Sequence, residues 1–114
     1  MELRQLKYFV KSAELMNFSV AAKHLYITQS TLSQQIKQLE LELGFELFLR
    51  NSRHISLTEA GEEFLPFARR TILDAEDAVQ RLNDLQNVRT GTLRIGVTYS
   101  LSTVLTEGVI TFLK

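Results

Sequence analysis

The sequence predicts a mainly α-helical chain: a winged helix-turn-helix, followed by a long dimerisation helix and a truncated βα unit. Three observations predict this fold class. Apolar residues recur at helical spacing through much of the first 90 positions. Two of the predicted helices are separated by only about three residues, which forces them to cross steeply. Two short apolar runs around a polar turn follow directly, as in a β-hairpin.

Composition excludes several classes of protein. The chain has 114 residues, of which 45% are hydrophobic and 23% charged, and it contains no cysteine. Disulfides and thiolate metal sites are therefore excluded. No apolar run approaches the roughly 18 residues that span a bilayer, and the first residues lack the apolar core of a signal peptide. We expect a soluble, cytoplasmic protein with no membrane partner.

The formal net charge is zero, but the acidic residues are unevenly distributed. None lies between Glu14 and Glu40, although Lys23, His24 and Lys37 fall within this stretch. A surface that faces phosphates requires such a stretch, because each carboxylate there would repel the nucleic-acid backbone. Chance combined with a buried helix is the alternative explanation.

The first two helices are predicted from apolar spacing. Residues 3–16 form one amphipathic helix, which residues 17–18 interrupt. Ser19 is a suitable N-cap for a short second helix. Its inward-facing positions include the small pair Ala21 and Ala22, which allows a neighbouring helix to approach closely.

A third helix is predicted between an N-cap at Thr28 and a terminating glycine, Gly44. Its outer face is free of acidic residues, and such side chains can donate to and accept from base edges in a major groove. A solvated polar face is the alternative. The apolar stripe consists of Leu32, Ile36, Leu39 and Leu43, and the outer face of Gln29, Ser30, Ser33, Gln34 and Lys37.

Residues 45–50 and 53–57 read as the two arms of a β-hairpin, called the wing below. Arg50 and Arg53 bracket its tip. An arginine at this place can enter a minor groove or hold a phosphate, although Arg53 could equally serve to solubilise the tip.

A long helix follows the wing. Thr58 can cap it, and Glu59, Glu62 and Glu63 lie in its first turn, where the helix dipole favours anions. An apolar seam with heptad spacing favours pairing with a second helix; a helix that covers its own domain is the alternative. Pro66 removes one backbone donor, so we expect a kink or a delayed start near Glu62. The dimerisation seam consists of Leu65, Ala68, Ile72, Ala75, Val79 and Leu82.

The last residues predict the start of another domain. Residues 92–98 alternate between apolar and polar as in a strand, and a further helix follows Ser102. A single βα unit has no parallel strand to pair with. The predicted domains are therefore residues 1–58, residues 59–90 and a truncated third over residues 91–114.

The sequence holds no recognisable motif for catalysis or for binding a metal or cofactor. His24 and His54 lack the pattern of a metal site. Glu40 and Glu42, two positions apart, face different sides of a helix, so joint acid–base chemistry is not expected. We expect neither enzyme activity nor a cofactor.

Residues 1–90 resemble the N-terminal region of LysR-type transcriptional regulators. The main matching segments are LKYF at 6–9, NFSVAA at 17–22, TQSTLSQQIKQLE at 28–40 and LTEAG at 57–61. The resemblance implies sequence-specific binding of double-stranded DNA by a homodimer or tetramer. The third helix would enter the major groove, and the wing would contact the minor groove or backbone. It also implies a C-terminal domain that senses a small-molecule effector.

The resemblance further implies a role for individual residues. Family members usually have proline where this chain has Ser30, and often arginine where it has Gln34. Because glutamine pairs better with adenine than with guanine, we expect an A·T-rich half-site. The base-reading positions are Gln29, Ser30, Ser33 and Gln34. The phosphate-contacting positions are Phe18, Ser19, Thr28, Thr31 and Lys37, and the wing arginines are Arg50 and Arg53.

Two other classes of function remain open. In a winged helix that binds proteins through its long helix, charge reversal at Lys37 and Arg53 would leave partner binding intact. A small-molecule-binding or enzymatic domain built on the βα unit would need residues that this chain lacks.

Overall fold

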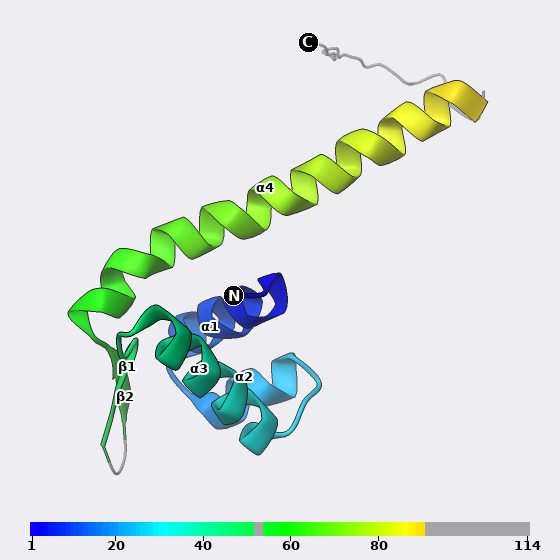
Figure 1. The fold of residues 1–114 in the computed structure, drawn as a ribbon. Coiled ribbons are helices and arrows are strands. Elements are labelled where there is room, and N and C mark those ends of the chain that lie inside the picture. The colour runs from blue at the N-terminus through cyan, green and yellow to red at the C-terminus, as the bar shows by residue number, and fades with distance from the viewer. Residues whose placement is uncertain (52–53, 91–114) are drawn as a thin grey trace. The chain divides into compact units, whose positions relative to one another are not determined.

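A computed structural model describes residues 1–51 and 54–90 (Figure 1). The order of elements confirms the predicted fold class of a winged helix-turn-helix followed by a long helix. The predicted βα unit lies outside the described residues. No helix within them is both long and apolar enough to span a lipid bilayer. The elements are α1 (Leu3–Leu15), α2 (Phe18–His24), α3 (Gln29–Leu43), β1 (Phe48–Arg50), β2 (Ile55–Leu57) and α4 (Glu59–Thr90).

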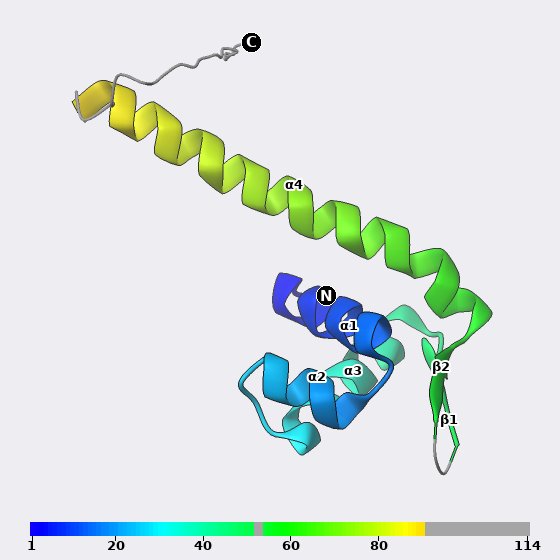
Figure 2. The same ribbon diagram turned by 180° about the vertical axis from the view of Figure 1, so that it is seen from behind.

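The chain divides into two units, residues 1–76 and 77–114. In the first unit α1, α2 and α3 pack on one another. The β1–β2 hairpin lies beside these helices, as the two opposite views in Figure 1 and Figure 2 show. The described part of the second unit is the end of α4, in which every residue from 77 to 88 is exposed. Because α4 runs through both units, its two halves have different surroundings.

The core of the first unit is centred on aromatic rings. The ring of Phe9 in α1 lies 5.5 Å from that of Phe48 in β1 and 5.4 Å from that of Phe64 in α4, measured between centroids. Apolar burial of this kind is the main driving force for folding. The buried apolar set is Leu6, Phe9, Ala13, Phe18, Ala21, Ala22, Leu32, Ile36, Leu39, Leu47, Phe48 and Ala68.

The predicted ends of α3 are confirmed. The hydroxyl oxygen of Thr28 accepts a hydrogen bond from the backbone N–H of Thr31 at 3.1 Å, which satisfies one of the free donors in the first turn. Gly44 ends the helix in the left-handed region with φ of 81°, a conformation that a residue without a Cβ adopts readily.

The predicted start of α2 is wrong. Asn17 caps this helix through its side-chain oxygen, which accepts from the N–H of Val20 at 3.0 Å. Phe18 is therefore the first helical residue, and Ser19 lies inside the first turn. Asn17 takes the cap because it has the extended backbone that a capping residue needs.

The predicted cap of α4 at Thr58 is confirmed, but the start of the helix is not delayed by Pro66. The helix begins directly after Thr58, whose hydroxyl accepts from the N–H of Gly61 at 2.9 Å, as expected for the cap. It is not delayed to Glu62, although Pro66 lies within it. The cap fixes the first turn, and Pro66 removes only one donor, which would have bonded the carbonyl of Glu62.

Candidate nucleic-acid interface

The structure leaves the polar face of α3 open. Gln29, Ser30 and Gln34 are exposed and Ser33 is half-buried, so the described residues do not cover them. On the opposite face the side chains are completely buried against the core. α3 therefore presents its hydrogen-bonding groups outward while its apolar stripe fixes its position. The buried stripe residues are Leu32, Ile36 and Leu39.

Three hydroxyl groups gather at the start of this face. Thr28 Oγ1 lies 2.9 Å from Thr31 Oγ1 and 3.3 Å from Ser30 Oγ, and all three residues are exposed. Since a hydroxyl both donates and accepts, this cluster offers groups for phosphate oxygens or base edges.

The polar face carries positive charge without a competing carboxylate. Lys23 and Lys37 are exposed, and among residues 1–51 and 54–90 neither has a carboxylate within 4.0 Å. α3 has two carboxylates, both near its end. Glu40 is buried and paired with Arg50 at 3.3 Å, and Glu42 is paired with the N-terminal amine. Such a surface attracts a polyanion.

Glu40 is a residue whose role sequence reasoning missed. The helical spacing puts it at the edge of the apolar stripe, four positions after Ile36, and that position was the available signal of burial.

At the start of α2 the structure separates the two predicted phosphate contacts. Ser19 is exposed, but Phe18 is only 9% exposed and its ring packs edge-on against Phe48, with centroids 5.2 Å apart. The ring of Phe18 is therefore part of the core, and only its backbone remains for a contact with a nucleic acid.

The wing is a two-stranded antiparallel hairpin in which Phe48 pairs with Leu57 and Arg50 with Ile55. Its strands are shorter than the predicted arms because the backbone pairs only over three residues on each side. Arg50 ends β1, as expected for a residue near the tip. Arg53, the other predicted wing arginine, lies outside the described residues.

The predicted seam of α4 falls into two parts. Ala68 is buried, and Leu65 and Ile72 pack against the core of the same chain. Ala75 is half-buried. Val79 and Leu82 are 58% and 65% exposed. The early positions thus follow the alternative of a helix that covers its own domain, and the late positions remain free to meet a partner.

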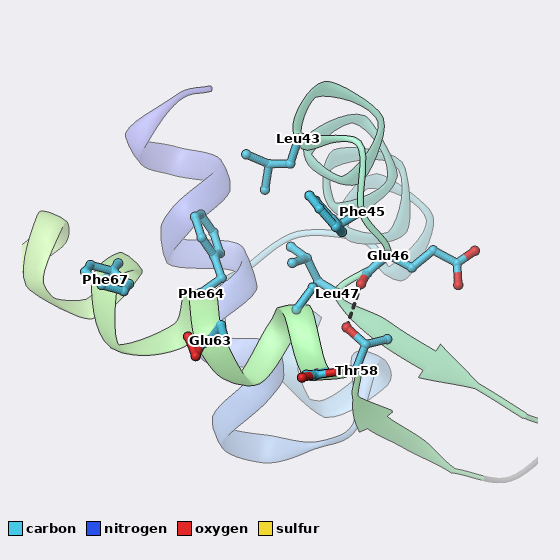
Figure 3. Close-up of a pocket in the computed structure, with 10 residues that line it drawn as sticks. Leu43, Phe45, Glu46, Leu47, Thr58, Glu63, Phe64 and Phe67 are labelled. Carbon is cyan, nitrogen blue, oxygen red and sulfur yellow. Dashed lines mark hydrogen bonds between the residues drawn. The ribbon is translucent and has the colours of Figure 1, made fainter.

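A pocket of about 740 Å³ lies between the end of α3 and the first turns of α4 (Figure 3). Leu43, Phe45 and Phe64 point toward one another in it. Three of the residues that line it are acidic, and negative charge around the pocket would repel a phosphate backbone. The pocket is therefore distinct in character from the polar face of α3. These acidic residues are Glu46, Glu59 and Glu63.

Within the described part of the chain, no group of three or more histidine, aspartate or glutamate side chains is arranged to hold a metal ion. The exposed polar features that the structure does show are the outer face of α3 with the hydroxyls at its start, and the partly exposed Arg50 at the end of β1.

One known family matches this chain by sequence. Its description is "Bacterial regulatory helix-turn-helix protein, lysR family", and the match covers residues 3–62. The transcriptional regulator BudR of Klebsiella aerogenes is 45% identical over 100 residues, which are 88% of this chain and 70% of BudR. The uncharacterised regulator YwqM of Bacillus subtilis is 44% identical over 103 residues. Those residues are 90% of this chain but 35% of YwqM, so the chain spans about a third of that relative.

Solved structures show the same fold. The DNA-binding domain of CbnR, crystallised with DNA, is 42% identical with a TM-score of 0.72, and the match covers 75% of this chain and 99% of that one. The DNA-binding domain of BenM, in a complex with benA site 1 DNA, is 38% identical with a TM-score of 0.72. That match covers 75% of this chain and 97% of the BenM chain.

Proposed function

Since the chain belongs to the lysR family of bacterial regulatory helix-turn-helix proteins, we propose that it binds specific sequences of double-stranded DNA and regulates transcription. The observation that carries this proposal is the outer face of α3. It is polar, largely exposed and free of carboxylates, while Leu32, Ile36 and Leu39 of the apolar stripe are completely buried. A helix held in this way can be inserted into a major groove as a rigid element.

The proposed base-reading side chains are on α3. Gln29, Ser30 and Gln34 are the exposed members, and Ser33 is half-buried beside them. With glutamine at position 34, adenine is the favoured base, because a glutamine amide can bond both N6 and N7 of adenine. The proposal therefore includes an A·T-rich half-site.

The proposed backbone contacts surround that face. They come from exposed hydroxyls and a lysine, and from Phe18 only through its main chain, since its ring is buried. Arg50 and Arg53 are the side chains through which the wing contacts the minor groove or the adjacent phosphates. The side chains assigned to phosphates are Ser19, Thr28, Thr31 and Lys37.

The functional unit is proposed to be a homodimer, or a tetramer built from dimers. Val79 and Leu82 on the exposed late part of α4 support this assignment, because apolar side chains at heptad spacing gain by pairing. Two copies would place two α3 helices on one duplex, at half-sites separated by about 34 Å or a multiple of it.

The remaining parts of the proposal concern the full-length regulator. Residues 1–58 bind DNA, residues 59–90 form the linker, and residues 91–114 begin a domain that takes a small-molecule effector. The regulator acts in the cytoplasm, where it meets DNA, and it carries out no catalysis.

The proposal is tested by selecting duplexes from a random pool and measuring their affinity by fluorescence anisotropy as salt is raised. We expect enrichment of paired half-sites and a linear fall of log affinity with log salt concentration, since cations are released from each neutralised phosphate. An affinity that does not weaken with salt, or a pool that is not enriched, would contradict the proposal.

A further inference from the structure

The carboxylate of Glu40 connects α3 to the first strand of the wing. Glu40 is 6% exposed. Its Oε2 accepts hydrogen bonds from the backbone N–H groups of Leu47 at 2.8 Å and Phe48 at 3.3 Å. Its Oε1 accepts from Nη2 of Arg50 at 3.3 Å. One side chain on α3 therefore holds three groups at the start and end of β1.

Arg50 has a second contact that extends this connection to α2. Its guanidinium carbon lies 5.4 Å from the centroid of the Phe18 ring, a cation–π contact. The Arg50 side chain is 35% exposed. It is thus fixed from two sides and still reaches the surface.

These contacts are costly to lose. A buried carboxylate whose partner is removed keeps its charge out of water without compensation. Hydrogen bonds to a charged acceptor are stronger than those between neutral groups. Because the bonds of Glu40 end on the backbone of β1, they constrain the direction in which the wing leaves α3.

We propose that Glu40 is a positioning residue for DNA binding, which fixes the wing relative to α3 and holds Arg50 in place at the surface. This inference rests on the proposed function. A wing and a helix that contact different parts of one duplex must keep a fixed relative placement, since small displacements in a binding surface are enough to lose its contacts.

The test uses the full chain and a duplex that the unmodified protein has selected from a random pool. Glu40→Gln keeps the shape of the side chain, but only one of its two terminal atoms, the amide oxygen, can accept a hydrogen bond. We expect a folded protein whose affinity for the selected duplex falls about tenfold. Hydroxyl-radical protection should disappear in the flanking minor groove and persist at the bases read by α3. The matched control is Glu46→Gln, at an exposed carboxylate of the same charge, and it should bind as the unmodified chain does.

Three results would overturn the inference. If Glu40→Gln bound like Glu46→Gln, the residue would have no part in positioning. If protection weakened evenly across the site, its role would be only structural. If the unmodified chain enriched no duplex, the proposed function itself would fail, whereas the first two results overturn only the role of Glu40.

Should Glu40→Gln unfold the chain, Arg50→Lys is the second variant. Lysine keeps the positive charge for a phosphate but lacks the planar group that binds Glu40 and lies over Phe18 together. The same selective loss of flank protection is expected. Unchanged flank protection in this variant would contradict the role of Glu40.

Discussion

Gly61 occupies a place in the first turn of α4 where the backbone of another segment comes close. A Cβ built at this position would lie 2.2 Å from the carbonyl oxygen of Leu47. The same junction is held by Thr58, whose hydroxyl donates to the carbonyl of Glu46 at 2.6 Å. The absence of a side chain at Gly61 therefore lets the wing and α4 meet.

Gly61→Ala should lower the free energy of unfolding by about 1 to 3 kcal/mol, because the new methyl group overlaps a backbone atom that cannot move aside. Urea unfolding measures this change. Gly44→Ala is the comparison, since a Cβ there meets nothing within 4 Å and only the left-handed φ opposes it. It should lose about 1 kcal/mol. A stabilised Gly61→Ala variant would contradict the proposed close contact.

Ser12 is a second residue with a measurable consequence. It is completely buried in α1, and its Oγ has no hydrogen-bond partner among residues 1–51 and 54–90. Ser12→Ala should raise the free energy of unfolding by about 1 kcal/mol, because it removes an unsatisfied hydroxyl and adds helix propensity. Thermal unfolding checks this, with Ser19→Ala at an exposed helical position as the control. A destabilised Ser12→Ala variant would indicate a bond that the buried hydroxyl makes after all.

Some of the helix-capping residues could be predicted individually from the sequence. Thr28, Gly44 and Thr58 follow local rules that depend only on neighbours in the sequence. Asn17 and Ser19 both satisfy those rules, and only the backbone conformation decides between them. Glu40 was harder, because its partners on β1 come from tertiary packing that no local pattern contains.

Among the elements, the proposed role of α3 has the clearest test, because the side chain at one of its positions should determine which base is preferred. Gln34→Arg is expected to change the preferred base at one position from adenine to guanine, with a discrimination of about 1 to 3 kcal/mol. Selection from a random pool measures it. Gln38→Arg adds the same charge at another exposed position of α3 and should strengthen binding to all duplexes similarly. An unchanged preference in Gln34→Arg would remove this residue from base reading.

The proposed dimer contact through the late part of α4 can be tested by introducing charged side chains there. Val79→Asp combined with Leu82→Asp should convert dimers to monomers, since the exposed apolar pair would become a pair of like charges. Sedimentation velocity measures the change. Leu73→Asp, at an exposed residue outside the seam, should leave the oligomeric state unchanged. A double variant that stays dimeric would locate the interface elsewhere.

The helices themselves were easier to predict than the surfaces against which they pack. The apolar periods of α1 and α3 correctly indicate the centre of each buried face, but not the burial of the polar residues Gln5, Ser12 and Glu40 beside it. The seam of α4 has the same spacing whether it covers a core or meets a second helix. Sequence periodicity could not separate these cases, and in the structure Leu65 and Ile72 are partly buried against the core of the same chain.

Considered as one chain, the order of elements could be predicted because each connection is short and each helix carries its own start and stop signals. Sequence punctuation does not show how far along α4 the packing against the first three helices extends. Between residues 59 and 88 the last half-buried position is Ala75, and every later one is exposed.

The burial of Ala68 has a consequence for assembly. Ala68 is 1% exposed in a single copy, in a cluster whose members all lie within residues 1–76, so these residues can fold before any second copy arrives. Unfolding of this unit should therefore occur at a temperature that does not depend on protein concentration, whereas an obligate dimer melts higher when concentrated. Calorimetry over a hundredfold dilution series distinguishes these cases. Dimerisation through the late part of α4 would then join units that are already folded, so dilution would separate the copies without unfolding them.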